Sequence, residues 1–150
     1  MHGFGKWNGS VRMRIIKHNM QRYDTCGDWF LVPAPTNADD DAVELQISIS
    51  DTGDDDANFL LYKHELLEAL LYLYKRNFTQ AAVEAVDKWD KSFIEDDTSC
   101  GVDEPGADPE CPCYAEHMMA SALEHDIAAQ LEMDWNYYTN LINNLEWQHE

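Results

Sequence analysis

Apolar and polar residues alternate most clearly at residues 43–50, where the chain reads VELQISIS. Every second residue is apolar there, and a period of two is typical of a β-strand with one buried face. The segments VRMRIIKH at 11–18 and DWFLV at 28–32 are also rich in β-branched or aromatic residues, and we predict two further strands there. The three segments together predict a small N-terminal antiparallel sheet with one face in water.

The hydrophobic period becomes that of a helix after the acidic stretch at 51–58. An acidic connection with glycine and proline, at about 95–113, then separates two groups of helical segments. The predicted helices are a first from about 57 to 75, a second that begins at a Thr79 cap, a third from about Tyr114 to Leu131, and a short fourth after an Asp134 cap. This order predicts an α+β fold in which the sheet precedes three to four packed helices.

The length of 150 residues fits a single domain. Residues 1–10 are rich in glycine and are predicted to be a flexible leader, so the domain is expected over 11–150. No stretch approaches the ~20 apolar residues of a membrane span, and the N-terminus has no apolar run of the signal-peptide type. We therefore expect a cytoplasmic protein without membrane contact, whose four cysteines are reduced.

The charge of the chain narrows the classes of partner. Ten Lys and Arg residues stand against 29 Asp and Glu residues, which gives a formal charge of −19. Direct nucleic-acid binding is not expected, because contact with phosphates requires a basic footprint. Divalent cations, a basic protein partner or mimicry of DNA remain compatible with this charge, and so does a simple role in solubility.

Ionisable side chains occupy apolar faces of the predicted helices. His64 lies within the apolar stripe of the first helix, and Glu68 lies one turn further on. On the third helix, His117 and Glu124 lie two turns apart on a face shared with alanines. A buried carboxylate is costly unless it is paired or bound to a metal. One divalent cation held by these four side chains would explain their positions, and this mixture of nitrogen and oxygen ligands suits zinc, manganese or iron.

Four further acidic residues receive supporting roles in this hypothesis. Asp87 and Asp90 of the second helix are candidates to orient a ligand histidine from behind, and Glu116 is grouped with them. Glu65 is the candidate catalytic base that activates water, as the glutamate of the H-E-x-x-H zinc proteases does. An alternative stays open, in which the same side chains form a buried, hydrogen-bonded network without a metal.

The cysteines suggest a competing metal site. Cys100, Cys111, Cys113 and His117 have the residue types of a Cys3His zinc knot, although only Pro112 separates the paired cysteines and such loops usually place two to four residues there. The acidic segment DTGDDDAN at 51–58 lacks the spacing of a calcium-binding EF-hand loop. Its aspartates are expected to stabilise the N-terminus of the first helix instead.

A resemblance to known proteins covers residues 11–138. It rests on several segments in a fixed order, which are LQISISDTGD, YKHELLEALLY, VEAVDKWDKSF, EPGADPECPCYAEHMMASALE and MDW. They resemble a family of small, mostly uncharacterised phage and bacterial proteins, and HELLEALL and DPECPCYAEHMMA are the most specific parts. The resemblance implies a phage origin. The residues that match the polar motif positions are His64, Glu65, Glu68, Asp87, Asp90, Glu116, His117 and Glu124. A weaker similarity to zincin-like metallohydrolases covers only 64–68, where Glu68 stands in place of the second histidine.

Two main functional hypotheses follow. The first is a phage accessory protein with a divalent-metal His/Glu site between two helices, acting as a zincin-like metal-dependent hydrolase. The second is a non-enzymatic acidic phage protein that binds or inhibits a basic host DNA-handling or defence protein, in the manner of a DNA mimic. A structural or assembly role, with WNYYTNLINNLEW as a docking helix, is a third possibility. The first hypothesis requires the first and third helices to meet at their polar residues.

Overall fold

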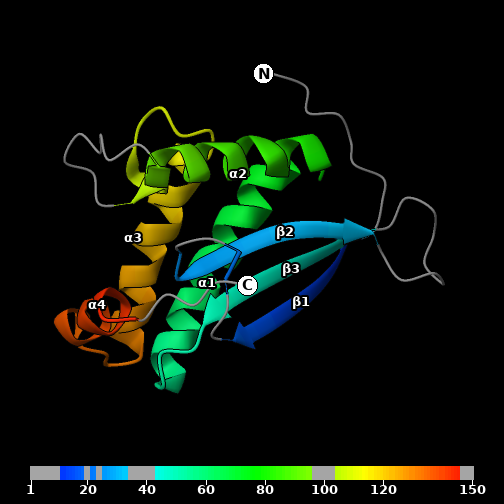
Figure 1. The fold of residues 1–150 in the computed structure, drawn as a ribbon. Coiled ribbons are helices and arrows are strands. Elements are labelled where there is room, and N and C mark those ends of the chain that lie inside the picture. Colours follow the sequence, from blue (N-terminus) through cyan, green and yellow to red (C-terminus); the bar gives the residue numbers. More distant parts are fainter. Residues whose placement is uncertain (1–10, 19–20, 23–24, 34–42, 96–103, 146–150) are drawn as a thin grey trace.

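A computed structural model describes residues 11–18, 21–22, 25–33, 43–95 and 104–145. Three strands precede four α-helices (Figure 1), which confirms the predicted α+β class. The elements are β1 (Val11–His18), β2 (Gly27–Pro33), β3 (Val43–Ser50), α1 (Asp55–Tyr74), α2 (Gln80–Glu95), the short 3-10 helix η1 (Pro105–Ala107), α3 (Tyr114–Gln130) and α4 (Trp135–Asn143). The predicted leader at 1–10 and residues 96–103 of the predicted acidic connection lie outside the described residues.

The sheet has the strand order β1-β3-β2 and is mixed. β2 pairs with β3 antiparallel, as predicted, with Trp29 opposite Ile47. β1 pairs with β3 parallel, with Val11 beside Val43, so the predicted antiparallel arrangement applies to one of the two ladders. An alternating pattern reads the same in both directions and therefore predicts a strand without its orientation.

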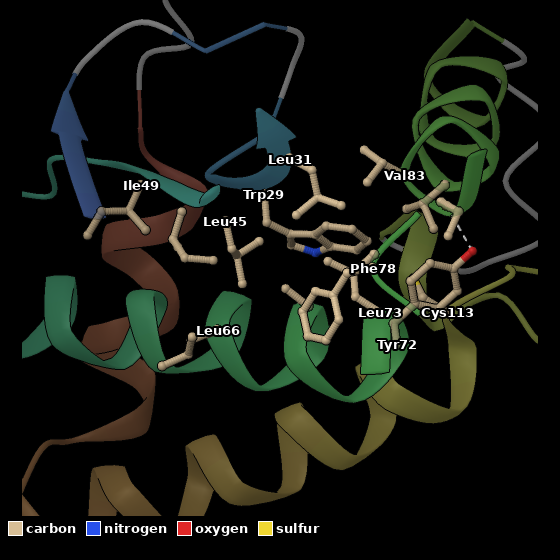
Figure 2. Packing of buried hydrophobic residues seen from close by; sticks show 14 of the residues in the cluster. Trp29, Leu31, Leu45, Ile49, Leu66, Tyr72, Leu73, Phe78, Val83 and Cys113 are labelled. Atoms are coloured by element: carbon tan, nitrogen blue, oxygen red, sulfur yellow. Dashed lines mark hydrogen bonds between the residues drawn. The ribbon is translucent and has the colours of Figure 1, made fainter. Parts of the chain in front are cut away.

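The apolar core lies between the sheet and α1. Leu45 and Ile47 of the central strand are fully buried, and Figure 2 shows Leu45 and Trp29 between the strands and the helix. Leu66, Tyr72 and Leu73 of α1 belong to the same cluster of buried side chains. One face of the sheet and one side of α1 thus form the main hydrophobic contact of the molecule.

Acidic residues begin α1 and α4, where the sequence predicts aspartates at the N-terminus of the first helix and an Asp134 cap on the fourth. The Asp54 carboxylate accepts a hydrogen bond from the Ala57 backbone N–H at 3.0 Å, and Asp55 and Asp56 lie in the first turn of α1. The Asp134 carboxylate accepts one from the Tyr137 N–H at 2.8 Å and begins α4. Within the described part of the chain, no helix is both long and apolar enough to cross a membrane.

Helix α3 packs against the side of α1 that faces away from the core of the sheet (Figure 1). The buried residues of α3 are Glu116, His117, Ala120, Glu124 and Ala128. Its large apolar residues Met118, Met119 and Leu123 are exposed instead. α3 therefore brings small and ionisable residues to α1, and this contact contains the candidate site.

Candidate metal centre

Three potential ligand atoms from α1 and α3 converge between the two helices. His64 Nε2 lies 3.2 Å from His117 Nδ1 and 3.4 Å from Glu68 Oε2, and His117 Nδ1 lies 2.8 Å from Glu68 Oε2. All three residues are buried. Within the described ranges, this is the single group of at least three His, Cys, Asp or Glu side chains that can hold a metal ion. The required meeting of the first and third predicted helices is therefore present.

Local structure explains how these side chains reach one point. His64 and Glu68 are four residues apart on α1, so they lie on one face of the helix. His117 lies in the first turn of α3, where its backbone N–H bonds to the Cys113 carbonyl at 2.8 Å. Gly106 of η1 packs against the His117 ring, since a Cβ there would lie 2.5 Å from Nδ1 and 2.6 Å from Cγ. Only glycine allows this segment to lie over the face of the ring.

A carboxylate lies behind each imidazole. His64 Nδ1 contacts Glu124 Oε2 at 2.6 Å, and His117 Nε2 lies 3.6 Å from Glu104 Oε1. Carboxylates in such positions fix the orientation and tautomer of histidines that bind metals. The sequence predicts Glu124 as a fourth ligand, whereas the structure places it on the opposite nitrogen of His64. Its position is that of an orienting group, because it does not join the converging atoms.

The second oxygen of Glu68 is held from the sheet side. The Trp29 indole N–H of β2 donates to Glu68 Oε1 at 3.0 Å, and the Cys113 thiol donates to the same atom at 3.6 Å. Glu68 Oε2 is thereby directed to the two histidines. Sequence reasoning missed Trp29 and Glu104, since an aromatic residue in a strand and an acid in a loop have no distinguishing pattern.

The electrostatics of the cluster favour positive charge. Burial opposes protonation of both imidazoles, but the contacts of His64 with Glu124 and Glu68 raise its pKa well above the ordinary value. In the same way, the contacts of His117 with Glu104 and Glu68 raise the pKa of His117 to about 10. Burial would raise the pKa of Glu68, but its hydrogen bonds to the two histidines lower it well below the ordinary value. The cluster thus has the electrostatic character of a cation site.

Protons on both facing nitrogens fit this cluster poorly. His64 Nε2 and His117 Nδ1 contact each other at 3.2 Å, so two N–H groups cannot both occupy the space between them. In addition, His117 Nε2 is buried and has no hydrogen-bond partner among the residues that the structure describes. A cation between the facing nitrogens would relieve the first problem and would leave a proton on the outer nitrogen of each ring.

Glu65 lies on the wall of the same cavity as the three converging residues. Its side chain is buried, and none of the described residues donates a hydrogen bond to its carboxyl group. A Cβ at Gly27 would collide with that carboxyl group, so a strand residue without a side chain makes room for it. Burial and the nearby Glu68 carboxylate raise the pKa of Glu65 well above its ordinary value.

Two of the three residues predicted to orient the ligands contact other partners. Asp87 lines the cavity but accepts two hydrogen bonds from Arg22, each of 3.1 Å. Asp90 also lines the cavity. Glu116 accepts a hydrogen bond from Lys75 at 2.8 Å and points away from the site, because neighbouring helical residues such as 116 and 117 diverge by about 100°. Glu124 is thus the carboxylate that bonds to the outer nitrogen of His64, whereas Glu104 lies 3.6 Å from that of His117 without a hydrogen bond.

The alternative zinc knot does not form among the residues that the structure describes. Cys111 and Cys113 are buried, and their sulfurs are 3.4 Å apart, but they do not join His117 in a group of ligands. The fourth predicted ligand, Cys100, lies outside the described residues. Cys113 instead contacts Glu68, so this thiol belongs to the surroundings of the His/Glu cluster.

Comparisons of the chain with protein-family models, curated proteins and solved structures give no match. The functional argument therefore rests on the geometry of the site. Two imidazoles and one carboxylate bind the metal in zinc hydrolases such as thermolysin, and the same ligand types bind iron in non-haem oxygenases.

Proposed function

We propose that this chain is a metal-binding protein in which His64 Nε2, His117 Nδ1 and Glu68 Oε2 hold one divalent ion. The size of the ligand triangle is the observation that carries this proposal. Tetrahedral zinc, with bonds of about 2.0–2.2 Å, separates its nitrogen and oxygen ligands by about 3.4 Å. The three distances here are 3.2, 3.4 and 2.8 Å. Zinc is the ion we expect, with manganese and iron as the alternatives for the same ligands.

A network without metal accounts less well for the same contacts. If His117 Nδ1–H donates to Glu68, then Nε2 has no hydrogen-bond partner, either as an acceptor in the neutral ring or as an N–H in the imidazolium that the raised pKa of His117 favours. If Nδ1 instead binds an ion, Nε2 carries the proton and directs it toward Glu104. The ion therefore accounts for the contacts at Nδ1 with a singly protonated ring.

The reaction that we propose is metal-assisted hydrolysis of an acyl bond. A bound zinc ion would polarise the substrate carbonyl and lower the pKa of water. Glu65 is proposed as the base, because its carboxyl group lies on the cavity wall and no described residue donates a hydrogen bond to it. Water adds its oxygen to the acyl carbon, and its proton passes through Glu65 to the amine or alcohol that leaves. The cavity volume, about 600 Å³, is within the range of small-molecule sites.

Metal content tests the first part of the proposal. Untagged protein should contain one zinc ion per chain, and His64→Ala and His117→Ala should each lose it. His125→Ala is the matched control, since His125 is an exposed histidine on the same helix as His117 and outside the ligand triangle. A chelator should lower the melting temperature of the wild type and of this control only. Absence of stoichiometric metal, with no effect of the chelator on the melting temperature, would falsify the proposal.

The role of Glu65 requires a separate test. Glu65→Gln should keep its zinc but hydrolyse peptide and ester reporter substrates at least about 100-fold more slowly, which is the range for loss of a general base. Metal analysis of the same sample separates loss of the base from loss of the ion. An unchanged rate in this variant would exclude Glu65 as the base.

A second candidate function is a phage protein that binds a basic host DNA-handling or defence protein and is not an enzyme. The chain has 29 acidic residues, and seven of those that the structure describes line the cavity, so the metal site leaves much of the negative charge unexplained. A DNA mimic should retain a host protein at low salt and release it on addition of duplex DNA. Retention that duplex DNA does not reverse would argue against mimicry.

A further inference from the structure

We propose that the substrate carries a positively charged group, an ammonium or a guanidinium, close to the amide or ester bond that is hydrolysed. This inference rests on the proposed hydrolase function and adds the chemical class of its substrate. The wall of the cavity contains charged and aromatic groups besides the three metal ligands.

Carboxylates dominate the charged groups of the cavity wall. Neither Lys nor Arg is present among the described residues that line it. The seven acidic residues on the wall are Asp28, Glu65, Glu68, Asp87, Asp90, Glu104 and Glu124. They come from β2, from three helices and from the residue before η1, so folding concentrates acids that are far apart in the sequence.

The positive charges near the wall do not balance these carboxylates. Arg22 bridges Asp28 and Asp87, with its shortest ion-pair distances at 2.6 and 3.1 Å. A divalent ion on the two histidines and Glu68 adds two charges. Even with Asp90 set aside, the carboxylates on the wall outnumber these positive charges, and a partly enclosed cavity concentrates their field. Phosphate esters and acidic peptides would be repelled, whereas a cationic side chain would be attracted.

A buried acceptor on the wall also indicates a ligand that donates hydrogen bonds. Glu65 is only 9% exposed, and no described residue donates a hydrogen bond to its carboxyl group. An amide N–H or an ammonium of the substrate would supply this donor at the place where the reaction is proposed to occur.

Aromatic rings form another part of the wall. Trp135 and Tyr138 of α4 both line the cavity, and their ring centroids are 5.2 Å apart. His125 stacks on Trp135 with a centroid distance of 3.5 Å, which holds the indole in place. Aromatic faces bind ammonium and guanidinium groups and also pack against their aliphatic stems. This combination of rings and carboxylates suits a lysine-like or arginine-like side chain.

Three hydroxamates that differ only in the side chain test this inference. The probes are the hydroxamates of Nα-acetyl-lysine, Nα-acetyl-norleucine and Nα-acetyl-glutamate, and the hydroxamate group of each binds zinc directly. Calorimetry with the zinc-loaded full chain should show the lysine probe binding at least about tenfold more tightly than the norleucine probe. The glutamate probe should be the weakest of the three. The preference for lysine should decrease as salt is added.

Glu104→Gln should reduce the preference for the lysine probe, since Glu104 lies on the cavity wall and its side chain is 62% exposed. Glu110→Gln is the matched control, because Glu110 is an exposed acid of the same segment that does not line the cavity. Equal binding of the three probes, or tighter binding of the glutamate probe, overturns the substrate class and leaves the metal site standing. Failure of every hydroxamate to bind overturns this inference together with the proposed hydrolase.

Discussion

Helix α1 has two buried sides that differ in chemistry. The side that faces the sheet presents apolar residues such as Leu66 and Leu73 to Leu45 and Trp29. The side that faces α3 presents His64 and Glu68 to a second histidine and a second glutamate. The apolar side gains free energy from every group that it removes from water, whereas the polar side gains only if each group finds a partner. The difference teaches that the first side maintains the fold and the second contains the candidate metal site.

Helix α3 also has two chemically different sides, but here the polar residues are buried and the large apolar residues are exposed. It buries ionisable and small residues and exposes Met118, Met119 and Leu123. An ordinary surface helix would bury the methionines and expose the acids. The reversed pattern agrees with a contact selected for a site, because buried charges contribute little net stability.

The largest effect on stability should come from the apolar side. Leu45→Ala removes a fully buried side chain and should lower the free energy of unfolding by about 2–5 kcal/mol, as measured by urea denaturation. The folded fraction should still bind one zinc ion. Met13 is the register partner of Leu45 in β1 but is 55% exposed, so Met13→Ala should change stability far less. Equal losses in the two variants would contradict the proposed location of the core.

Substitutions on the polar side of α1 and at its contacts should change the affinity for metal much more than the free energy of unfolding. Glu124→Gln removes the carboxylate behind His64 and should weaken zinc binding by about 10–100-fold, measured by competition with a chromogenic chelator. Asp126→Asn, at an exposed position two residues along the same helix, should leave the affinity unchanged. A complete loss of zinc on Glu124→Gln would instead support the sequence-based prediction that Glu124 is a ligand.

The packing of η1 on the site gives a smaller effect. Gly106→Ala places a methyl group against the His117 ring and should weaken zinc binding by about tenfold, because the ring must move. Ala115→Ser, at an exposed position in the first turn of α3, is the control. If the affinity is the same in both variants, the segment does not position His117.

The smallest effect should come from the exposed side of α3. Met119→Gln should change the free energy of unfolding by less than about 0.5 kcal/mol, since Met119 is 54% exposed. The neighbouring Ala120→Gln should destabilise by about 1–3 kcal/mol, because Ala120 is fully buried against α1. If the order of the two were reversed, α3 would have to be rotated, and His117 and Glu124 could not face α1.

Much of the fold could be predicted because its signals are local. The alternation of VELQISIS predicts β3 at its observed bounds, and the caps at Asp54 and Asp134 begin α1 and α4 within the predicted segments. The candidate site was predictable in part for the same reason. Helical spacing places His64 with Glu68, and a second histidine on another polar helix face indicates a partner. The parallel pairing of β1 depends on the path of the chain between strands and has no such local signal.

The sequence by itself determined which residue types are present and which face of each helix they occupy, since side-chain direction follows from backbone periodicity. Only the tertiary structure decided which nitrogen of each histidine meets which carboxylate. It placed Glu124 behind His64 and Glu68 in front, and it brought Trp29 and Gly106 to the cluster. The physical reason is that ligand geometry depends on differences below 1 Å between atoms of separate elements, and packing sets those distances, whereas spacing along the chain does not.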